Sequence, residues 1–226
     1  MDIDRIRDAV KRNANENFHK LQNLGFCDYD QLEHIAKALI EEIASIELKM
    51  QISDRLLSEV FKTHEFKNMF QTGFTNGAYR PEYRAFLSNK FFDTPLEPYS
   101  LKNSEKYGFA FAKKAADDYG DNIVVFNKND LICRTTATLG DSYNFSGTLP
   151  FLLDDINATI GAVLPNAYVI RQYFNRSKHA NLVTDLLHKT CLSLPETIKQ
   201  HTYAHFMELQ FHGILSTDSI DHIYKI

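Results

Sequence analysis

Hydrophobic residues recur every three or four positions in the first part of the chain, which is the spacing of one face of an α-helix. One such stripe runs over residues 3–21 and a second over residues 32–46. Ser53 is placed to cap a third helix. The apolar residues of that helix would be Leu56, Leu57, Val60 and Phe61. Because no Gly-rich loop or polar cluster stands out here, we predict that residues 1–63 form a helical annex.

From residue 64 onward, alternation with a period of two and runs of β-branched residues predict strands. The predicted strands cover residues 66–77, 122–126, 131–142 and 201–213. Helical spacing and capping residues predict helices over 81–92, 181–192 and 216–223, and another that starts at Asp154 and Asp155. Two prolines and little periodicity predict a loop over 93–106. Together these elements indicate an α+β fold with a core domain over residues 64–226.

Composition narrows the class of function. The net charge of -4 and a pI near 6.1 argue against nucleic-acid binding, which requires a basic surface. No run of about 18 apolar residues is present, so we expect no membrane span. The charged N-terminus lacks the apolar region of a secretory signal peptide. Three cysteines without a CxxC spacing, Cys27, Cys133 and Cys191, are expected to be reduced thiols in small core positions.

The segment MELQFHG, residues 207–213, is the strongest candidate for chemistry. Side chains alternate along a strand, so Glu208, Gln210 and His212 share one face. The opposite face, predicted to contact the core, carries Met207, Leu209 and Phe211. The polar face is either an ordinary solvated face or a carboxylate fixed in a pocket, and the pattern leaves both open. A fixed carboxylate suits stabilisation of positive charge that develops at a sugar anomeric carbon.

Two turn-like segments, TGFTNG (72–77) and TLGDSYNF (138–145), place hydroxyl residues and glycine at predicted strand ends. Such turns can present hydroxyl and backbone N–H groups to a nucleotide, but they are also common in turns without a function. Three arginines near these turns can each bind a diphosphate through a bidentate contact or remain ordinary surface residues. They are Arg80, Arg84 and Arg134.

A metal site is a further alternative, since His201 and His205 are four residues apart and Glu208 follows. In the helical HExxH motif a Glu follows the first His, whereas Thr202 stands there in this chain. On a strand, residues four apart are separated by on the order of 13 Å, which is too far to share a metal ion. A metal-dependent hydrolase is therefore the weakest of the alternatives, and we predict no metal site.

The order of these segments resembles the ADP-ribosyltransferase toxin superfamily. The resemblance rests on TGFTNG, KYG (106–108), RTTATLGDS and MELQFHG, and it covers roughly residues 64–226. Among the groups of this superfamily, the chain is most similar to the CteC group of bacterial effectors, which ADP-ribosylate ubiquitin on a threonine. The resemblance implies a split, mainly antiparallel sheet that binds NAD. It also implies a secreted bacterial effector that acts in the host cytosol on a host protein, with ubiquitin as the candidate target.

The resemblance also implies roles for individual residues. The superfamily usually carries E-x-E or Q-x-E with the last Glu catalytic, whereas here Glu208 precedes Gln210. We expect Glu208 to be catalytic because only it carries a formal negative charge. The residues expected to bind NAD are Thr72, Thr75, Asn76, Arg80, Tyr107, Thr138, Ser142, Phe145 and Gln210. Of these, Tyr107 or Phe145 would stack on the nicotinamide ring. The alternative from another class is a non-catalytic binding module whose Glu208 face is solvated.

Overall fold

The computed structural model describes residues 2–23, 44–74, 80–139, 141–143, 149–155, 158 and 207–226. Seven strands of this part of the chain form one antiparallel sheet. They are β1 (Leu48–Ile52), β3 (Lys106–Ala110), β4 (Asn122–Phe126), β5 (Thr135–Leu139), β6 (Phe151–Leu152), β7 (Met207–Phe211) and β9 (Ile220–Lys225). Their order is β6-β5-β7-β3-β1-β4-β9, so β7 lies inside the sheet between β3 and β5. With the helices around it, this sheet gives the predicted α+β class.

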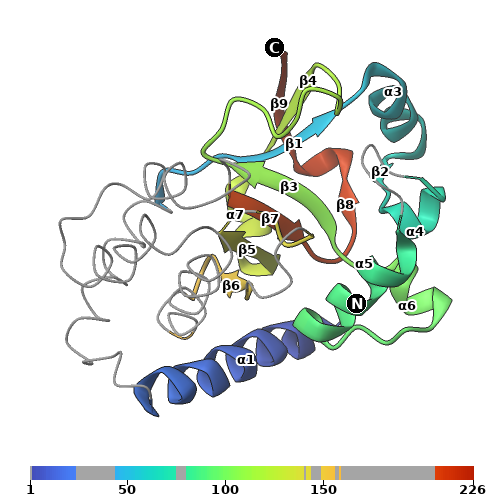
Figure 1. Cartoon of the computed structure of the whole chain (residues 1–226). Coiled ribbons are helices and arrows are strands. Elements are labelled where there is room, and N and C mark those ends of the chain that lie inside the picture. Colours follow the sequence, from blue (N-terminus) through green and yellow to red (C-terminus); the bar gives the residue numbers. More distant parts are fainter. Residues whose placement is uncertain are drawn as a thin grey trace.

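The described helices flank this sheet (Figure 1). They are α1 (Ile3–Asn23), α3 (Asp54–Thr63), α4 (Met69–Thr72), α5 (Pro81–Phe92), α6 (Pro98–Lys102) and α7 (Lys128–Leu131), with 3-10 turns η1 (Ile132–Arg134) and η2 (Thr217–Ser219). A two-stranded ladder pairs β2 (Glu65–Phe66) with β8 (Leu215–Ser216). Helix α1 runs along the bottom of the view and contacts α5 and β6, whereas α3, β2 and α4 follow one another along the right-hand side.

One face of the sheet forms the main hydrophobic core. Alternate residues of β7, namely Met207, Leu209 and Phe211, are at most 1% exposed on this face. They belong to one cluster with residues of α1, β1 and β4, including Ile6, Val10, Leu48, Val124 and Phe126. Burying a side chain of this size stabilises a protein by roughly 1.5–3 kcal/mol, so this face supplies much of the driving force for folding.

Several predicted elements are confirmed. Helix α3 follows Ser53, whose side chain accepts a hydrogen bond from the N–H of Leu56 at 3.4 Å. Helix α5 begins at Pro81, where a missing N–H has no cost. Strand β4 covers residues 122–126 as predicted.

Other parts of the chain differ from the predictions. Residues 48–52 were assigned to the helical annex but form β1, an interior strand between β3 and β4. The strand predicted over 66–77 is wrong, because residues 69–72 form α4. There Asn68 and Gln71 make a capping box, which provides hydrogen-bond partners for the free N–H groups at the start of the helix. These hydrogen bonds favour a helix although the hydrophobic residues alternate with a period of two.

The segments at 93–106 and 216–223 also differ from their predictions. Residues 98–102 of the predicted loop form α6, which starts at Pro98. The helix predicted over 216–223 is wrong, since only the turn η2 is helical and β9 begins at Ile220. Pairing of β9 with β4 supplies backbone hydrogen bonds that a short isolated helix cannot match. The predicted strand 131–142 is shorter and begins at Thr135.

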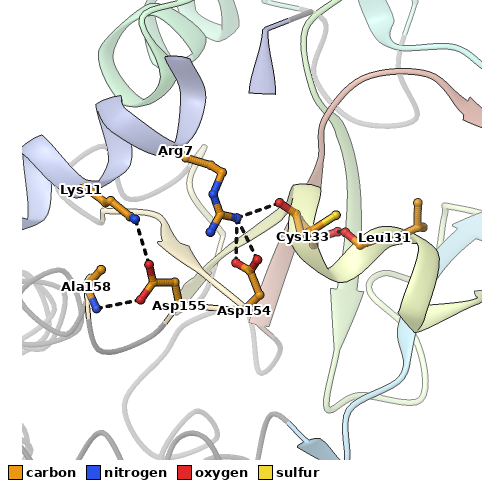
Figure 2. A network of polar contacts seen from close by, with 8 residues as sticks. Arg7, Lys11, Leu131, Cys133, Asp154, Asp155 and Ala158 are labelled. Carbon is orange, nitrogen blue, oxygen red and sulfur yellow. Dashed lines mark hydrogen bonds and ion pairs between the residues drawn. The ribbon is translucent and has the colours of Figure 1, made fainter. Parts of the chain in front are cut away.

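Polar contacts join α1 to the segment that follows β6 (Figure 2). Arg7 Nη1 donates to both carboxylate oxygens of Asp154, at 2.8 and 2.9 Å, and to the carbonyl of Cys133 at 2.8 Å. Lys11 lies 2.9 Å from Asp155, which also accepts the N–H of Ala158 at 3.2 Å. The hydrogen bond from the N–H of Ala158 to Asp155 has the spacing of a helix cap, in agreement with the helix start predicted here. Cys133 is exposed rather than a core residue.

Candidate functional site

A cavity of about 280 Å³ lies where β1 and β3 separate. Only one residue pair, Lys49 with Phe109, joins these strands, whereas five pairs join β3 to β7. Gly108 permits even this contact, because a Cβ there would lie 2.3 Å from the carbonyl oxygen of Lys49. Beyond this pair the strands part, and Gln51 and Tyr107 line the cavity.

The walls of the cavity come from separate stretches of the chain. The segment from α3 to α4 supplies a mixed wall, in which polar residues alternate with the apolar side chains of Leu56, Val60, Phe66, Phe70 and Phe74. The loop over residues 111–121 supplies Ala115 and Tyr119. Gln51 holds this loop in place: its amide donates to the carbonyls of Ala116 and Gly120, and its oxygen accepts the N–H of Ala115 at 2.7 Å.

Glu208 lies in the wall of this cavity and is only 5% exposed. The alternative that its strand face is solvated is therefore wrong: β7 is an interior strand, and both of its faces are covered. Its Oε1 accepts hydrogen bonds from the Ser142 hydroxyl and from Gln210 Nε2, the latter at 2.9 Å. Burial, reinforced by the nearby Asp141, raises the pKa of Glu208 to about 8.

Behind Glu208, a chain of hydrogen bonds runs through β5 and β7. Gln210 Nε2 also contacts Thr138 at 3.2 Å, and Gln210 Oε1 accepts the hydroxyl of Thr136 at 2.9 Å. The Thr136 hydroxyl then accepts from His212 Nε2, 2.9 Å away, which places the ring proton of His212 on Nε2. Burial, together with Lys106 and Arg134, lowers the pKa of His212 to about 3, so the ring is neutral. Gln210 therefore supports Glu208 from behind and does not line the cavity.

Arg84 of α5 places a positive charge close enough to Glu208 to favour its ionised form. Its guanidinium lies 4.0 Å from the centre of the Tyr107 ring and 5.0 Å from that of Tyr143. Its Nη1 donates to Ser142 at 3.3 Å. Burial opposes this charge, but Tyr107, Glu208 and the other acidic groups outweigh burial and raise the pKa of Arg84. The arginine thus remains a cation inside the cavity.

Of the residues predicted from sequence, Glu208, Gln210, Thr138, Ser142 and Tyr107 are brought together. Thr72 lines the cavity, but its hydroxyl bonds to the carbonyls of Asn68 and Phe74. Arg80 is exposed at the start of α5 and does not line the cavity. The predictions for Thr75, Asn76, Phe145, His201 and His205 fall outside the described residues.

Sequence reasoning missed Glu105, Asp141 and Tyr143, and it named Arg84 only as one of three arginines. Glu105 directly precedes KYG, Tyr143 directly follows GDS and Asp141 is part of GDS, so these segments were the available signal. The position of Arg134 is structural, because its Nη1 donates to the carbonyls of His212 and Ile214.

Comparisons with known proteins do not assign a family. No protein-family model matches the chain, and no curated protein matches it significantly. Among the described residues, no cluster of three or more His, Cys, Asp or Glu side chains is arranged to hold a metal ion. In the same part of the chain, no helix has both the length and the apolar character needed to cross a membrane.

Proposed function

We propose that the protein is a mono-ADP-ribosyltransferase that transfers ADP-ribose from NAD to a side chain of a host protein. The observation that carries this proposal is the buried carboxylate of Glu208, fixed by Ser142 and Gln210 in the wall of a cavity. In this proposal, the junction between β1 and β3 corresponds to the split of the sheet at which the superfamily binds NAD. A threonine of ubiquitin is the first acceptor to test, and the host cytosol is the proposed place of action.

The chemistry needs a negative charge beside the ribose. Cleavage of the nicotinamide–ribose bond gives an oxocarbenium-like transition state, which a fixed carboxylate stabilises most strongly where water is excluded. The elevated pKa of Glu208, about 8, means that its carboxylate is poorly stabilised when the cavity is empty. The cationic nicotinamide ring would lower this pKa on binding, so substrate binding would itself create the charged form.

Arg84 and the hydroxyl of Ser142 complete the proposed site. A guanidinium that stays charged at all relevant pH values and contacts one hydroxyl is suited to bind a phosphate of NAD. In this role Arg84 takes the place that the sequence pattern gave to Arg80. Since Ser142 contacts both Arg84 and Glu208, it would hold the phosphate-binding and ribose-binding groups in a fixed relation.

The test is intact mass spectrometry of ubiquitin and of host lysate proteins after incubation with the protein and NAD. An added ADP-ribose is expected with the wild type, and Glu208→Gln should lower the rate about 10²- to 10³-fold. Glu59→Gln is the matched control, because Glu59 lines the same cavity but is exposed. Labelling by Glu208→Gln at the wild-type rate would refute the assignment of the catalytic residue.

The apolar side chains in the cavity wall favour one other function, a module that binds an apolar segment of a partner without catalysis. Leu56, Phe70 and Phe74, which are not fully buried, would contact that segment. NAD separates the two functions: a transferase should release nicotinamide and unfold at a higher temperature with NAD present. If millimolar NAD has neither effect while candidate targets are present, the binding module is the better assignment.

A further inference from the structure

The guanidinium of Arg84 is held mainly by aromatic rings. Its central carbon lies 4.0 Å from the centre of the Tyr107 ring and 5.0 Å from that of Tyr143. In the described part of the chain, its hydrogen-bond partner is the hydroxyl of Ser142, at 3.3 Å. A guanidinium carries five N–H donors, so the rings hold this cation in place while most of its donors stay available to a ligand.

The ring of Tyr107 is itself fixed at both ends. At its base, Tyr107 belongs to β3 and lies opposite Gln210 of the interior strand β7. At its tip, the hydroxyl donates a hydrogen bond to Oε1 of Glu105, which also accepts the hydroxyl of Ser88 at 2.5 Å. Glu105 is only 1% exposed, and both donors hold the same oxygen atom. A ring fixed in this way presents one face to the guanidinium in a defined place.

The position of Arg84 matters for Glu208. Ser142 donates a hydrogen bond to Glu208 Oε1 and accepts one from Arg84, so the guanidinium lies one hydroxyl away from the carboxylate. Burial and the nearby Asp141 raise the pKa of Glu208, whereas Arg84 acts in the opposite direction. A displaced guanidinium would no longer oppose the effect of burial, and Glu208 would hold its proton more tightly.

We propose that Tyr107 is a positioning residue: its ring holds the Arg84 guanidinium beside Ser142 and thereby favours the carboxylate form of Glu208. This inference rests on the proposed function, in which the guanidinium binds a phosphate and the carboxylate faces the ribose. A cation over an aromatic face is attracted more strongly where the pair is desolvated, and neither Arg84 nor Tyr107 is an exposed residue. The role differs from the stacking on nicotinamide expected from the resemblance, because Arg84 occupies one face of the ring.

The experiment follows the titration of the Glu208 carboxyl by NMR of glutamate-labelled protein without NAD, with Glu208→Gln used to assign the signal. Arg84→Met removes the charge and should raise the proton affinity of Glu208 about 10-fold, which moves the midpoint up by about one pH unit. Tyr107→Leu removes the ring and should give most of this increase. Tyr107→Phe keeps the aromatic face and should give less than about a third of it.

The direction of the change separates positioning from a merely structural role. If Tyr107→Leu only opened the cavity to water, relief of burial would lower the pKa of Glu208 instead. A lower or unchanged midpoint in Tyr107→Leu therefore overturns the inference. An equal increase in Tyr107→Phe also overturns it, because the effect would then belong to the hydroxyl. Tyr99→Leu is the matched control: Tyr99 is 81% exposed on α6, so the midpoint should not change.

Two further measurements complete the test. In the wild type, the ring current of Tyr107 should shift the NMR signals of the Arg84 side chain away from those of free arginine. Signals at the position of free arginine overturn the inference even if Tyr107→Leu does not fold. Inorganic pyrophosphate, measured by calorimetry, should bind Tyr107→Leu about 10-fold more weakly than Tyr107→Phe, and equal binding overturns the inference. If pyrophosphate does not bind the wild type, the phosphate role in the proposed function fails, whereas the Glu208 titration still decides the role of Tyr107.

Discussion

The two faces of β7 are both buried, but one is apolar and the other is polar. Met207, Leu209 and Phe211 pack into the main core, whereas Glu208 lines the cavity and Gln210 belongs to the chain of hydrogen bonds behind it. The first face contributes stability through burial of apolar surface. The second buries groups that prefer water, and it retains them only through specific partners. Burial alone therefore does not identify a core residue, and stability and function can be separated on one strand.

The largest effect is expected from breaking the apolar face. Phe211→Ala should lower the free energy of unfolding by about 3–5 kcal/mol, because the ring is 1% exposed and lies 5.1 Å from that of Phe126. Denaturant unfolding measures this loss. Ile214→Ala, three residues later and 68% exposed, should change stability by less than about 0.5 kcal/mol. Similar losses in both variants would contradict the assignment of Phe211 to the core.

On the polar face, a substitution should raise the free energy of unfolding rather than lower it. The folded-state pKa of Glu208, about 8, lies above its unfolded value of about 4.5, so the folded state binds a proton that the unfolded state releases. The wild type should therefore lose stability as the pH rises from about 4.5 to about 8. Glu208→Gln mimics the protonated form and should match the wild type at about pH 4, below both pKa values of Glu208. At pH 9 it should be more stable by on the order of 2–4 kcal/mol.

Unfolding of both proteins across this pH range provides the measurement, since the difference between them isolates residue 208. Glu59→Gln is the control for loss of a carboxylate at an exposed position of the same cavity wall. A difference for Glu208→Gln that is constant with pH would mean that Glu208 is not held in the protonated form.

A smaller loss is expected from the chain of hydrogen bonds behind Glu208. Thr136→Val keeps the shape of the side chain but leaves Gln210 Oε1 and His212 Nε2 without their partner, at a cost of roughly 1–3 kcal/mol. Thr136→Ser retains the hydroxyl and should restore most of the stability. Thermal unfolding of the three proteins tests this, and equal destabilisation by Val and Ser would show that packing rather than hydrogen bonding matters at this position.

The smallest effect is expected at β9, the edge of the described sheet, on the sheet face that carries Glu208. His222 of β9 shares this face, but its side chain is 51% exposed. His222→Gln should therefore change the free energy of unfolding by less than about 0.5 kcal/mol. Denaturant unfolding of both proteins at neutral pH measures this change in the free energy of unfolding. A loss as large as that of Thr136→Val would show that the polar face is energetically uniform out to its edge.

Local signals in the sequence were sufficient for some elements and for the chemistry of β7. Ser53 and Pro81 marked helix starts because capping depends on a few adjacent residues. The alternation in MELQF separated apolar from polar side chains correctly. The same pattern could not show that the polar side is buried, because that depends on whether strands pair on both sides of β7.

The rest of the site depends on contacts between distant parts of the chain. Arg84 meets Ser142 across 58 residues, and Ser142 meets Glu208 across 66. No local periodicity specifies such pairs, which follow from the register of β3, β5 and β7. Strand β1 was missed because its five residues continue directly from a stripe of helical spacing. At α4, the capping box contributed by Asn68 and Gln71 prevailed over an alternation of aromatic residues.

The order of strands across the junction of β1 and β3 has a consequence for synthesis of the chain. On one side lie β1, β4 and β9, and on the other lie β3, β5, β6 and β7, so the chain crosses the junction repeatedly. Neither side can be completed from one contiguous stretch of sequence. Strand β9 is the last described strand, and it pairs with β4 about a hundred residues earlier. The sheet therefore cannot be complete before residues 220–225 have been synthesised and have paired with β4, and such pairing between distant parts of a chain slows folding.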